Sequence, residues 1–243
     1  MKKGFLLGLL TWLGLTGCQH HCTNPVDPFE PINRNIYKMN MAFDATFLKP
    51  PADLYIWMIP VQIRAGVNNV YDNIATLPTI ANDILQLQTR HTIHDIGRFS
   101  LNSTLGLAGL GDVATKLGVP RHHNDFGLTI AHWGNHYSPY VMIPFLGPCT
   151  LRDSFSLLVD YTFFTPYPFI PNPMLYRVLG LRYIDLRSQM SDNIELLKNA
   201  IDPYVMMRDA YLSRRLNQIS QNQKGSVNLD EDDSTNLYVE DSD

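Results

Sequence analysis

Prolines recur along this chain and limit the length of the helices that it can form. All 16 prolines lie at or after residue 25. A proline removes one backbone donor and clashes with the preceding turn, so it normally ends a helix or occupies its first turn. Between the prolines, apolar residues recur every three or four positions, which predicts amphipathic helices. The expected fold is therefore mostly α, a single domain of short amphipathic helices interrupted by proline.

The individual helices follow from this spacing and from their end signals. Pro78 should separate two short helices, and Gly118 and Gly134 should end two others. Asn124 or Asp125 can cap one helix, Thr150 with Asp153 a second, and Asp202 before Pro203 a third. The run 140–148 contains Pro144 and is expected to be extended. The expected helices are 33–48, 63–74, 80–87, 91–105, 112–117, 126–133, 151–159, 183–201 and 203–212.

The N-terminal residues have the layout of an export signal. Lys2 and Lys3 precede a 12-residue apolar run, which is shorter than the ~20 residues that a membrane-spanning helix needs. Small residues before Cys18 resemble the lipobox of bacterial lipoproteins, in which the cysteine is acylated. An ordinary signal peptide that contains a cysteine is the alternative. The expected division is a signal peptide over 1–17 and a lipidated tether over 18–26, and Gln19 favours the outer membrane.

Charge is distributed unevenly along the remaining chain. Residues 224–243 carry seven acidic residues and one lysine, whereas residues 18–223 carry 16 charges of each sign. A body without net charge argues against nucleic acid as a partner, because phosphate binding needs a basic surface. The polar, acidic segment 218–243 is expected to be disordered, which leaves 27–217 as the folded domain.

The sequence contains little that would support catalysis. His91 and His94 could share a helix face, but no glutamate completes a metalloprotease signature, and no serine lies in a Gly-x-Ser-x-Gly elbow. We therefore expect no catalytic residue, no metal site and no cofactor. Cys22 and Cys149 could form a disulfide in an oxidising compartment, or Cys149 could be a buried thiol.

Five blocks of residues, in order, resemble the MlaA lipoprotein family, which is also called VacJ. They cover roughly residues 27 to 217. The blocks are Asp27-Pro-Phe-Glu30 with Asn33-Arg34; Asn102-Ser-Thr-Leu-Gly106 with Gly109 and Asp112-Val-Ala; Asp125-Phe-Gly with Trp133-Gly; Pro144-Phe-Leu-Gly-Pro148 with Thr150-Leu-Arg-Asp153; and Asp202-Pro-Tyr204 with Arg208 and Ala210-Tyr211. Cys149 stands where serine is common in that family.

The resemblance implies a ring-like helical lipoprotein on the periplasmic side of the outer membrane of a Gram-negative bacterium, bound to trimeric porins. Its amphipathic channel would remove mislocalised phospholipid from the outer leaflet and pass it to a periplasmic carrier protein, and it would not be an enzyme. Two alternatives are a phospholipase or esterase that hydrolyses the same lipids, and a structural lipoprotein that accompanies porins without moving lipid.

Seven residues are candidates for the lipid path or for a membrane-facing surface. The helix 33–48 follows the anchor closely and carries Phe43 and Phe47 on its apolar face, which could lie in a membrane interface or pack on the core. The segment 125–153 combines aromatic residues with charged ones, a mixture that suits a wall along which lipid passes or a packed joint in the core. Its candidates are Trp133, Tyr140, Phe145, Arg152 and Asp153.

Overall fold

The computed structural model of this chain describes residues 25–236. The signal peptide, Cys18 and Cys22 lie outside these residues, so the expectations for acylation and for a disulfide remain predictions. Cys149 is buried with a free thiol, and burial raises its pKa.

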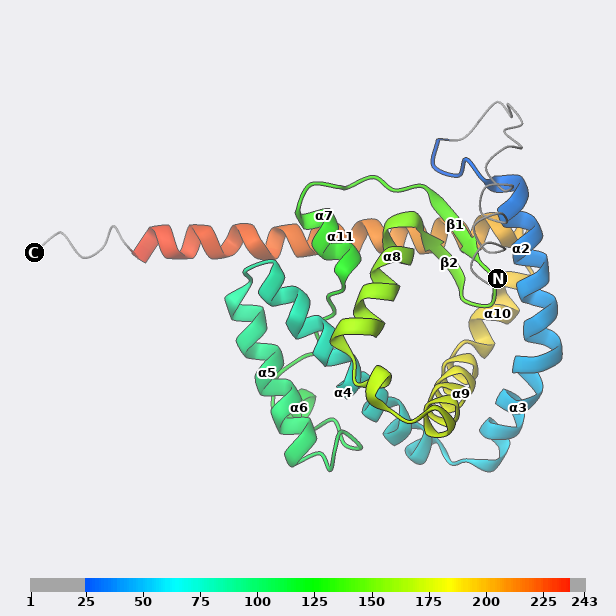
Figure 1. The fold of residues 1–243 in the computed structure, drawn as a ribbon, viewed down its shortest axis with the longest axis horizontal. Helices are drawn as coiled ribbons and strands as arrows, with labels where there is room; N and C mark the ends of the chain where they lie inside the picture. The colour runs from blue at the N-terminus through cyan, green and yellow to red at the C-terminus, as the bar shows by residue number, and fades with distance from the viewer. Residues whose placement is uncertain (1–24, 237–243) are drawn as a thin grey trace, which may run out of the picture.

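The described chain is mostly helical, as the sequence predicts, with one small two-stranded sheet (Figure 1). The first half contains α2 (Glu30–Phe43), the π-helical turn η1 (Asp44–Leu48), α3 (Lys49–Met58), α4 (Val61–Leu85), α5 (Thr89–Thr104), α6 (Val113–Lys116) and α7 (Phe126–His132). The second half contains β1 (Tyr140–Ile143), β2 (Gly147–Thr150), α8 (Leu151–Val159), η2 (Asp160–Phe164), η3 (Tyr167–Phe169), α9 (Asn172–Gln189), α10 (Ser191–Lys198) and α11 (Pro203–Asn236).

These elements close into a ring. Each of the following contacts the next: α2, β1, β2, α8, η2, α4, α9, α3 and η1, and η1 contacts α2 again. Figure 1 shows this closed path, with α5 packed outside it against α4 and with α11 running across one side and beyond the body. The ring expected from the family resemblance is therefore confirmed.

The ring is closed where α2 meets the hairpin of β1 and β2. The Asn33 side chain donates to the Tyr140 carbonyl at 3.3 Å and accepts from the Met142 amide at 2.9 Å. Two turns further along α2, Asn40 donates to the Ile143 carbonyl at 2.9 Å and accepts from the Phe145 amide at 2.8 Å. The outer edge of a strand has unpaired backbone groups. The side-chain amides of Asn33 and Asn40 bond to these groups on β1 and its turn, in place of a third strand.

The start of α2 is also tied to the start of α11. Asp27 accepts hydrogen bonds from the Tyr204 hydroxyl at 2.6 Å and from Arg208 at 3.3 Å. Arg34 forms a two-pronged ion pair with Asp202, at 3.2 and 2.8 Å. The first and last sequence blocks of the resemblance therefore form one joint.

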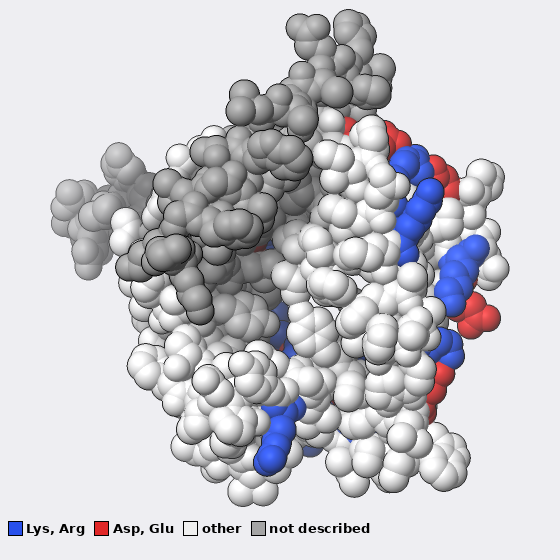
Figure 2. Space-filling model, turned by 45° about the vertical axis from the view of Figure 1, so that its right-hand side comes forward, with Lys and Arg blue, Asp and Glu red and all other residues white. Residues whose placement is uncertain are grey.

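Polarity is reversed relative to an ordinary globular protein. Among the side chains that the structure describes, 26 buried residues are polar or charged and only 12 are apolar. Large apolar side chains point outward instead, such as Trp57, Phe163 and Phe169, which are 82%, 74% and 86% exposed. Figure 2 shows a face on which uncharged residues predominate; most of its charged side chains lie along the right-hand edge, and some basic ones lie lower on the face and in the hollow at its centre. Such an exterior is stable only against apolar surroundings or a partner.

The helices differ from the expectation at Pro78 and at Met190, and the sequence also did not predict α3 or the start of α9 at Asn172. Pro78 lies inside the single helix α4 and does not separate two helices, because α4 is held along its length by α5, α7 and α9. The single helix expected over 183–201 is two, α9 and α10, which meet at Met190. This break lets α9 pack on α3 while α10 packs on α11.

The folded part also extends beyond residue 217. Helix α11 continues to Asn236, and Ile219 and Asn222 are both buried. Ile219 packs with Leu128 and Ala131 of α7. Helix α11 thus continues past residue 218, where the change in composition suggests the end of the folded domain.

Candidate functional site

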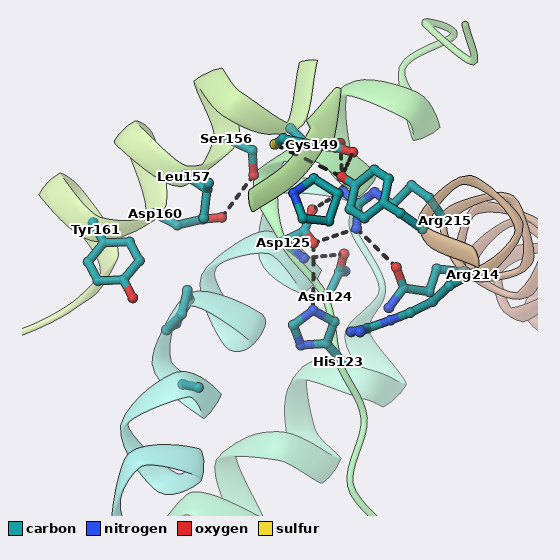
Figure 3. Close-up of a pocket in the computed structure, with 16 residues that line it drawn as sticks. His123, Asn124, Asp125, Cys149, Ser156, Leu157, Asp160, Tyr161, Arg214 and Arg215 are labelled. Atoms are coloured by element: carbon teal, nitrogen blue, oxygen red, sulfur yellow. Dashed lines mark hydrogen bonds and ion pairs between the residues drawn. The ribbon is translucent and has the colours of Figure 1, made fainter. Parts of the chain in front are cut away.

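A cavity of about 320 Å³ lies between α4, the segment before α7, β2, α8 with η2, and α11 (Figure 3). Its apolar wall comes from Ala75, Pro78, Pro148, Leu157 and Tyr161, and its polar wall comes from His123, Asn124, Asp125, Asp153, Ser156, Asp160, Arg214, Arg215 and Gln218. His123 and Arg214 are both exposed. The cavity therefore offers an amphipathic ligand apolar contact together with the guanidinium of Arg214 and the imidazole of His123.

The polar wall is built on a buried guanidinium. Arg215 of α11 donates to both oxygens of Asp125, at 2.7 and 2.6 Å, and to Asp153 at 2.8 Å. Burial alone would raise the pKa of Asp125, but the hydrogen bonds and charge of Arg215 hold it well below its usual value. Two-pronged, charge-assisted bonds of this kind fix geometry strongly, so Arg215 holds α7 and α8 at a set separation.

Asp153 is shared between several donors. Besides Arg215, it accepts from Arg152 at 3.0 Å and from the Tyr211 hydroxyl at 2.7 Å. Its backbone amide in turn donates to Thr150, the N-cap of α8, at 3.2 Å. The capping role that the sequence predicts for Thr150 is therefore confirmed, and Asp153 also belongs to the charged network.

Gly127 is the residue that lets this network approach α7. A Cβ atom built at this position would lie 2.4 Å from the Asp153 carboxylate and 2.5 Å from the Arg215 guanidinium. Asp125 caps α7 by accepting from the Leu128 amide at 2.9 Å. The Asp-Phe-Gly block thus supplies a cap, an ion-pair partner and the space that the ion pair needs.

Ser156 and Asp160 complete the wall on the side of α8. The Ser156 hydroxyl donates to Asp160 at 3.0 Å and accepts from the Gly127 amide at 2.8 Å. Asp160 also accepts from Asn82 at 2.9 Å and from the Phe126 amide at 3.1 Å. Burial raises the pKa of Asp160 despite these hydrogen bonds.

The seven candidate residues are distributed over separate places. Asp153 lines the cavity, and Arg152 lies behind it with a second contact to the Asn135 carbonyl at 3.1 Å. Tyr140 is fully buried beside Met142 and Tyr204 and faces no surface. Trp133 is exposed, and its ring and that of Phe126 form a T-shaped pair with 6.0 Å between centroids.

The three phenylalanines form one aromatic cluster, and none of them lines the cavity that contains Asp153. The ring of Phe43 lies 5.1 Å from that of Phe47 and 4.8 Å from that of Phe145. Phe47 and Phe145 are 62% and 54% exposed, while Phe43 is half-buried between them. This aromatic cluster joins the end of α2 to the turn of the hairpin and presents an apolar surface.

Sequence reasoning did not select Arg214, Arg215 or His123 as candidates. A signal was present for Arg215, because an arginine on the apolar face of an amphipathic helix needs a buried partner. That partner, Asp125, lies 90 residues away, so helical periodicity alone does not find it.

Comparison with known proteins identifies related chains over most of the length. A family model described as MlaA lipoprotein matches residues 25–218. The intermembrane phospholipid transport system lipoprotein MlaA of Escherichia coli strain K12 is 34% identical over 208 residues, which cover 82% of each chain. The Haemophilus influenzae protein of the same name is 28% identical, over 86% of this chain and 87% of that one.

A solved structure shares the fold as well. It comes from work described as "Structural basis for maintenance of bacterial outer membrane lipid asymmetry". The match has a TM-score of 0.70 at 31% identity and covers 79% of this chain and 98% of that chain.

Proposed function

Because this chain belongs to the MlaA lipoprotein family, we propose that it maintains outer-membrane lipid asymmetry by moving phospholipids. It takes phospholipid misplaced in the outer leaflet through its ring and delivers it to a carrier protein in the periplasm. Cys18 is the acylated anchor, trimeric porin is the partner in the membrane, and the protein does not hydrolyse the lipid.

The reversed polarity of the ring is the observation that carries this proposal. An apolar exterior is stable among acyl chains, and the polar side of the cavity wall, where Arg214 is exposed, offers a charged headgroup contacts that the hydrocarbon does not. No helix of residues 25–236 combines the length and the apolar character needed to cross a membrane. The outward-facing apolar side chains and the acyl anchor would hold the ring in one leaflet.

The cavity fits one part of a phospholipid at a time. Its volume of about 320 Å³ lies at the lower end of small-molecule pockets. Arg214 provides a cationic group and His123 an imidazole ring for a headgroup phosphate, and Leu157 and Tyr161 provide apolar contact for acyl chains. A site of this kind guides an amphipathic molecule and does not enclose it.

The arrangement of the serine in the cavity favours transport over hydrolysis. A serine nucleophile needs a base within hydrogen-bonding distance and must also be reached by its substrate. Ser156 has the Asp160 carboxylate beside it, but the residue is only 3% exposed and its oxygen also accepts from the Gly127 amide. This serine holds α7 and α8 together, so the phospholipase alternative has no support from the cavity.

Narrowing the cavity tests the proposed route. In a strain without the native protein, Ala75→Phe should fold normally but leave phospholipid exposed at the cell surface, because the new ring occupies the space against the α4 wall. Ala210→Phe makes the same change at an exposed position of α11 and should restore asymmetry fully. Surface phospholipid, protein abundance and melting temperature are measured for each variant.

The same strains separate the alternatives. Full activity of a folded Ala75→Phe protein would exclude this cavity as the route. Release of fatty acid from phospholipid by the purified wild-type protein would support hydrolysis. Unchanged surface phospholipid in the deletion strain would leave only a structural role.

A further inference from the structure

Three ionisable side chains from different parts of the fold meet behind the cavity wall. Asp83 lies near the end of α4, Asp95 in α5, and His122 in the segment that leads into α7. One ligand atom from each lies within 4.8 Å of the other two. Both aspartates are fully buried, and His122 is mostly buried.

One oxygen of this cluster has no hydrogen-bond partner. Asn124 donates to Oδ1 of Asp83 at 2.7 Å, whereas Oδ2 of Asp83 is buried without a partner. His122 Nδ1 lies 3.0 Å from Asp95 Oδ2 and 3.8 Å from Asp83 Oδ2. A ring nitrogen carries at most one proton, so the bond to Asp95 leaves Asp83 Oδ2 without a donor. A buried carboxylate oxygen in this position is costly unless a cation or a proton compensates it.

We infer that Asp83, Asp95 and His122 form a binding site for a divalent transition metal ion of the zinc type. Zinc binds imidazole nitrogen and carboxylate oxygen at about 2.0–2.2 Å, which places neighbouring ligands of a tetrahedral ion about 3.3 Å apart. The two distances from His122, 3.0 and 3.8 Å, lie on either side of this value. The imidazole ligand favours zinc over magnesium or calcium, which prefer oxygen ligands alone.

The residues around the cluster have the contacts that a metal site requires. Each carboxylate keeps its second oxygen in a hydrogen bond, Asp83 with Asn124 and Asp95 with His94 Nδ1 at 3.2 Å. Such outer contacts orient ligands. The His91 ring stacks on His122 with 4.5 Å between centroids. A second cavity of about 380 Å³, lined by His91 and His122 among others, would give the ion an entry path and room for a water molecule as fourth ligand.

The site would have a positioning role. His122 is followed directly by His123, Asn124 and Asp125, which line the cavity described above. A bound ion would join the α4–α5 pair to this segment and fix one wall of the cavity. Sequence reasoning missed the site because its ligands come from three separate elements and no short motif contains them.

The test measures zinc binding by the purified full-length protein in detergent. The protein is stripped with EDTA and titrated with ZnCl₂ at neutral pH, with MgCl₂ and CaCl₂ in parallel, while bound metal and melting temperature are recorded. The wild-type protein should bind one Zn²⁺ per chain and melt several degrees higher with it, and Mg²⁺ and Ca²⁺ should have little effect.

Variants assign the binding to the cluster. Asp83→Asn and His122→Gln should each bind zinc at least about tenfold more weakly and lose the shift in melting temperature. The metal-free Asp83→Asn protein should remain as stable as the wild type, because the neutral amide removes a buried charge. His132→Gln, on α7 and outside the cluster, and Asp53→Asn, at an exposed position of α3, should behave as wild type.

Either of two results would overturn the inference. One is a wild-type protein that binds no zinc above the level of the Asp83→Asn variant. The other is equal binding by His122→Gln and His132→Gln. If the wild-type protein binds no zinc and Asp83→Asn also raises the melting temperature, the buried charge of the two aspartates is compensated by a shared proton and not by a metal ion.

Discussion

Because Gly127 has no Cβ atom, the charged network that holds α7, α8 and α11 together can pack against its backbone. Because its neighbours are the head groups of a buried ion pair, they cannot move aside without losing hydrogen bonds. Gly127→Ala should destabilise the fold by about 1–3 kcal/mol, the usual cost of overpacking. Thermal or denaturant unfolding measures the change.

Gly180→Ala is the matched control for this change. Gly180 lies within α9, and a Cβ atom there would meet nothing within 4 Å. Alanine stabilises a helix interior by about 0.5–1 kcal/mol relative to glycine. A loss of stability that is equal in both variants would contradict the steric argument for Gly127.

The carboxyl group of Asp112 should make the stability of the fold depend on pH. Burial alone would raise the pKa of Asp112, but hydrogen bonds from Thr115 and Arg98 lower it to about 2. A carboxyl group with a lowered folded-state pKa adds stability above its unfolded pKa of about 3.9, and the gain is lost as pH falls through the folded value. Asp112→Asn can still cap α6 but loses the charge that pairs with Arg98.

The Asp112→Asn variant should therefore be less stable than wild type by about 1–2 kcal/mol at pH 7. The difference should shrink between about pH 4 and pH 2, where the wild-type carboxyl takes up its proton. Urea unfolding at several pH values measures it. A difference that stays constant from pH 7 to pH 2 would argue against the ion pair as its cause.

Among the elements, α11 shows where the folded part ends. Ile219 packs on α7, and Asn222 lies within 3.3 Å of Gln88 and 3.4 Å of Asn124. Truncation after Gln218 should lower the melting temperature by about 5–10 °C, since losing a buried isoleucine costs about 2–3 kcal/mol in a chain of this size. Truncation after Gln223 retains both contacts and should change it by no more than about 2 °C. Equal melting temperatures for the two truncations would contradict the packing of Ile219.

The sequence predicts most element ends because their causes are local. Asp125, Thr150 and Asp202 each bond to an amide two or three residues along the chain, so a short window of sequence contains both partners. The buried charged network of Arg215, Asp125 and Asp153 could not be predicted this way, because the closed fold brings together residues that are 62 and 90 positions apart. Pro78 failed as a helix end for the same reason: contacts with three other helices outweigh its local preference.

The molecule's exposed apolar surface can be tested for contact with lipid at the aromatic cluster of Phe43, Phe47 and Phe145. Phe47→Asp should leave the melting temperature within about 2 °C of wild type, because the side chain is mostly exposed. The same variant should bind phospholipid vesicles more weakly, since it places a charge on the apolar surface. Phe43→Asp should cost far more stability because its ring is packed between Phe47 and Phe145. Vesicle binding by Phe47→Asp equal to that of wild type would contradict a lipid-facing role for this surface.

Closure of the ring through Asn33 has a consequence for folding order. Its hydrogen bond to Tyr140 joins residues 107 positions apart, and contacts of such long range form slowly because a large loop must first be closed. The polar side chains that the structure buries leave water when the chain folds, whereas exposed apolar side chains such as Trp57 and Phe169 remain in contact with it. Folding and transfer into lipid therefore remove different surfaces from water, and a fully folded molecule that has not reached a membrane still carries most of its aggregation risk.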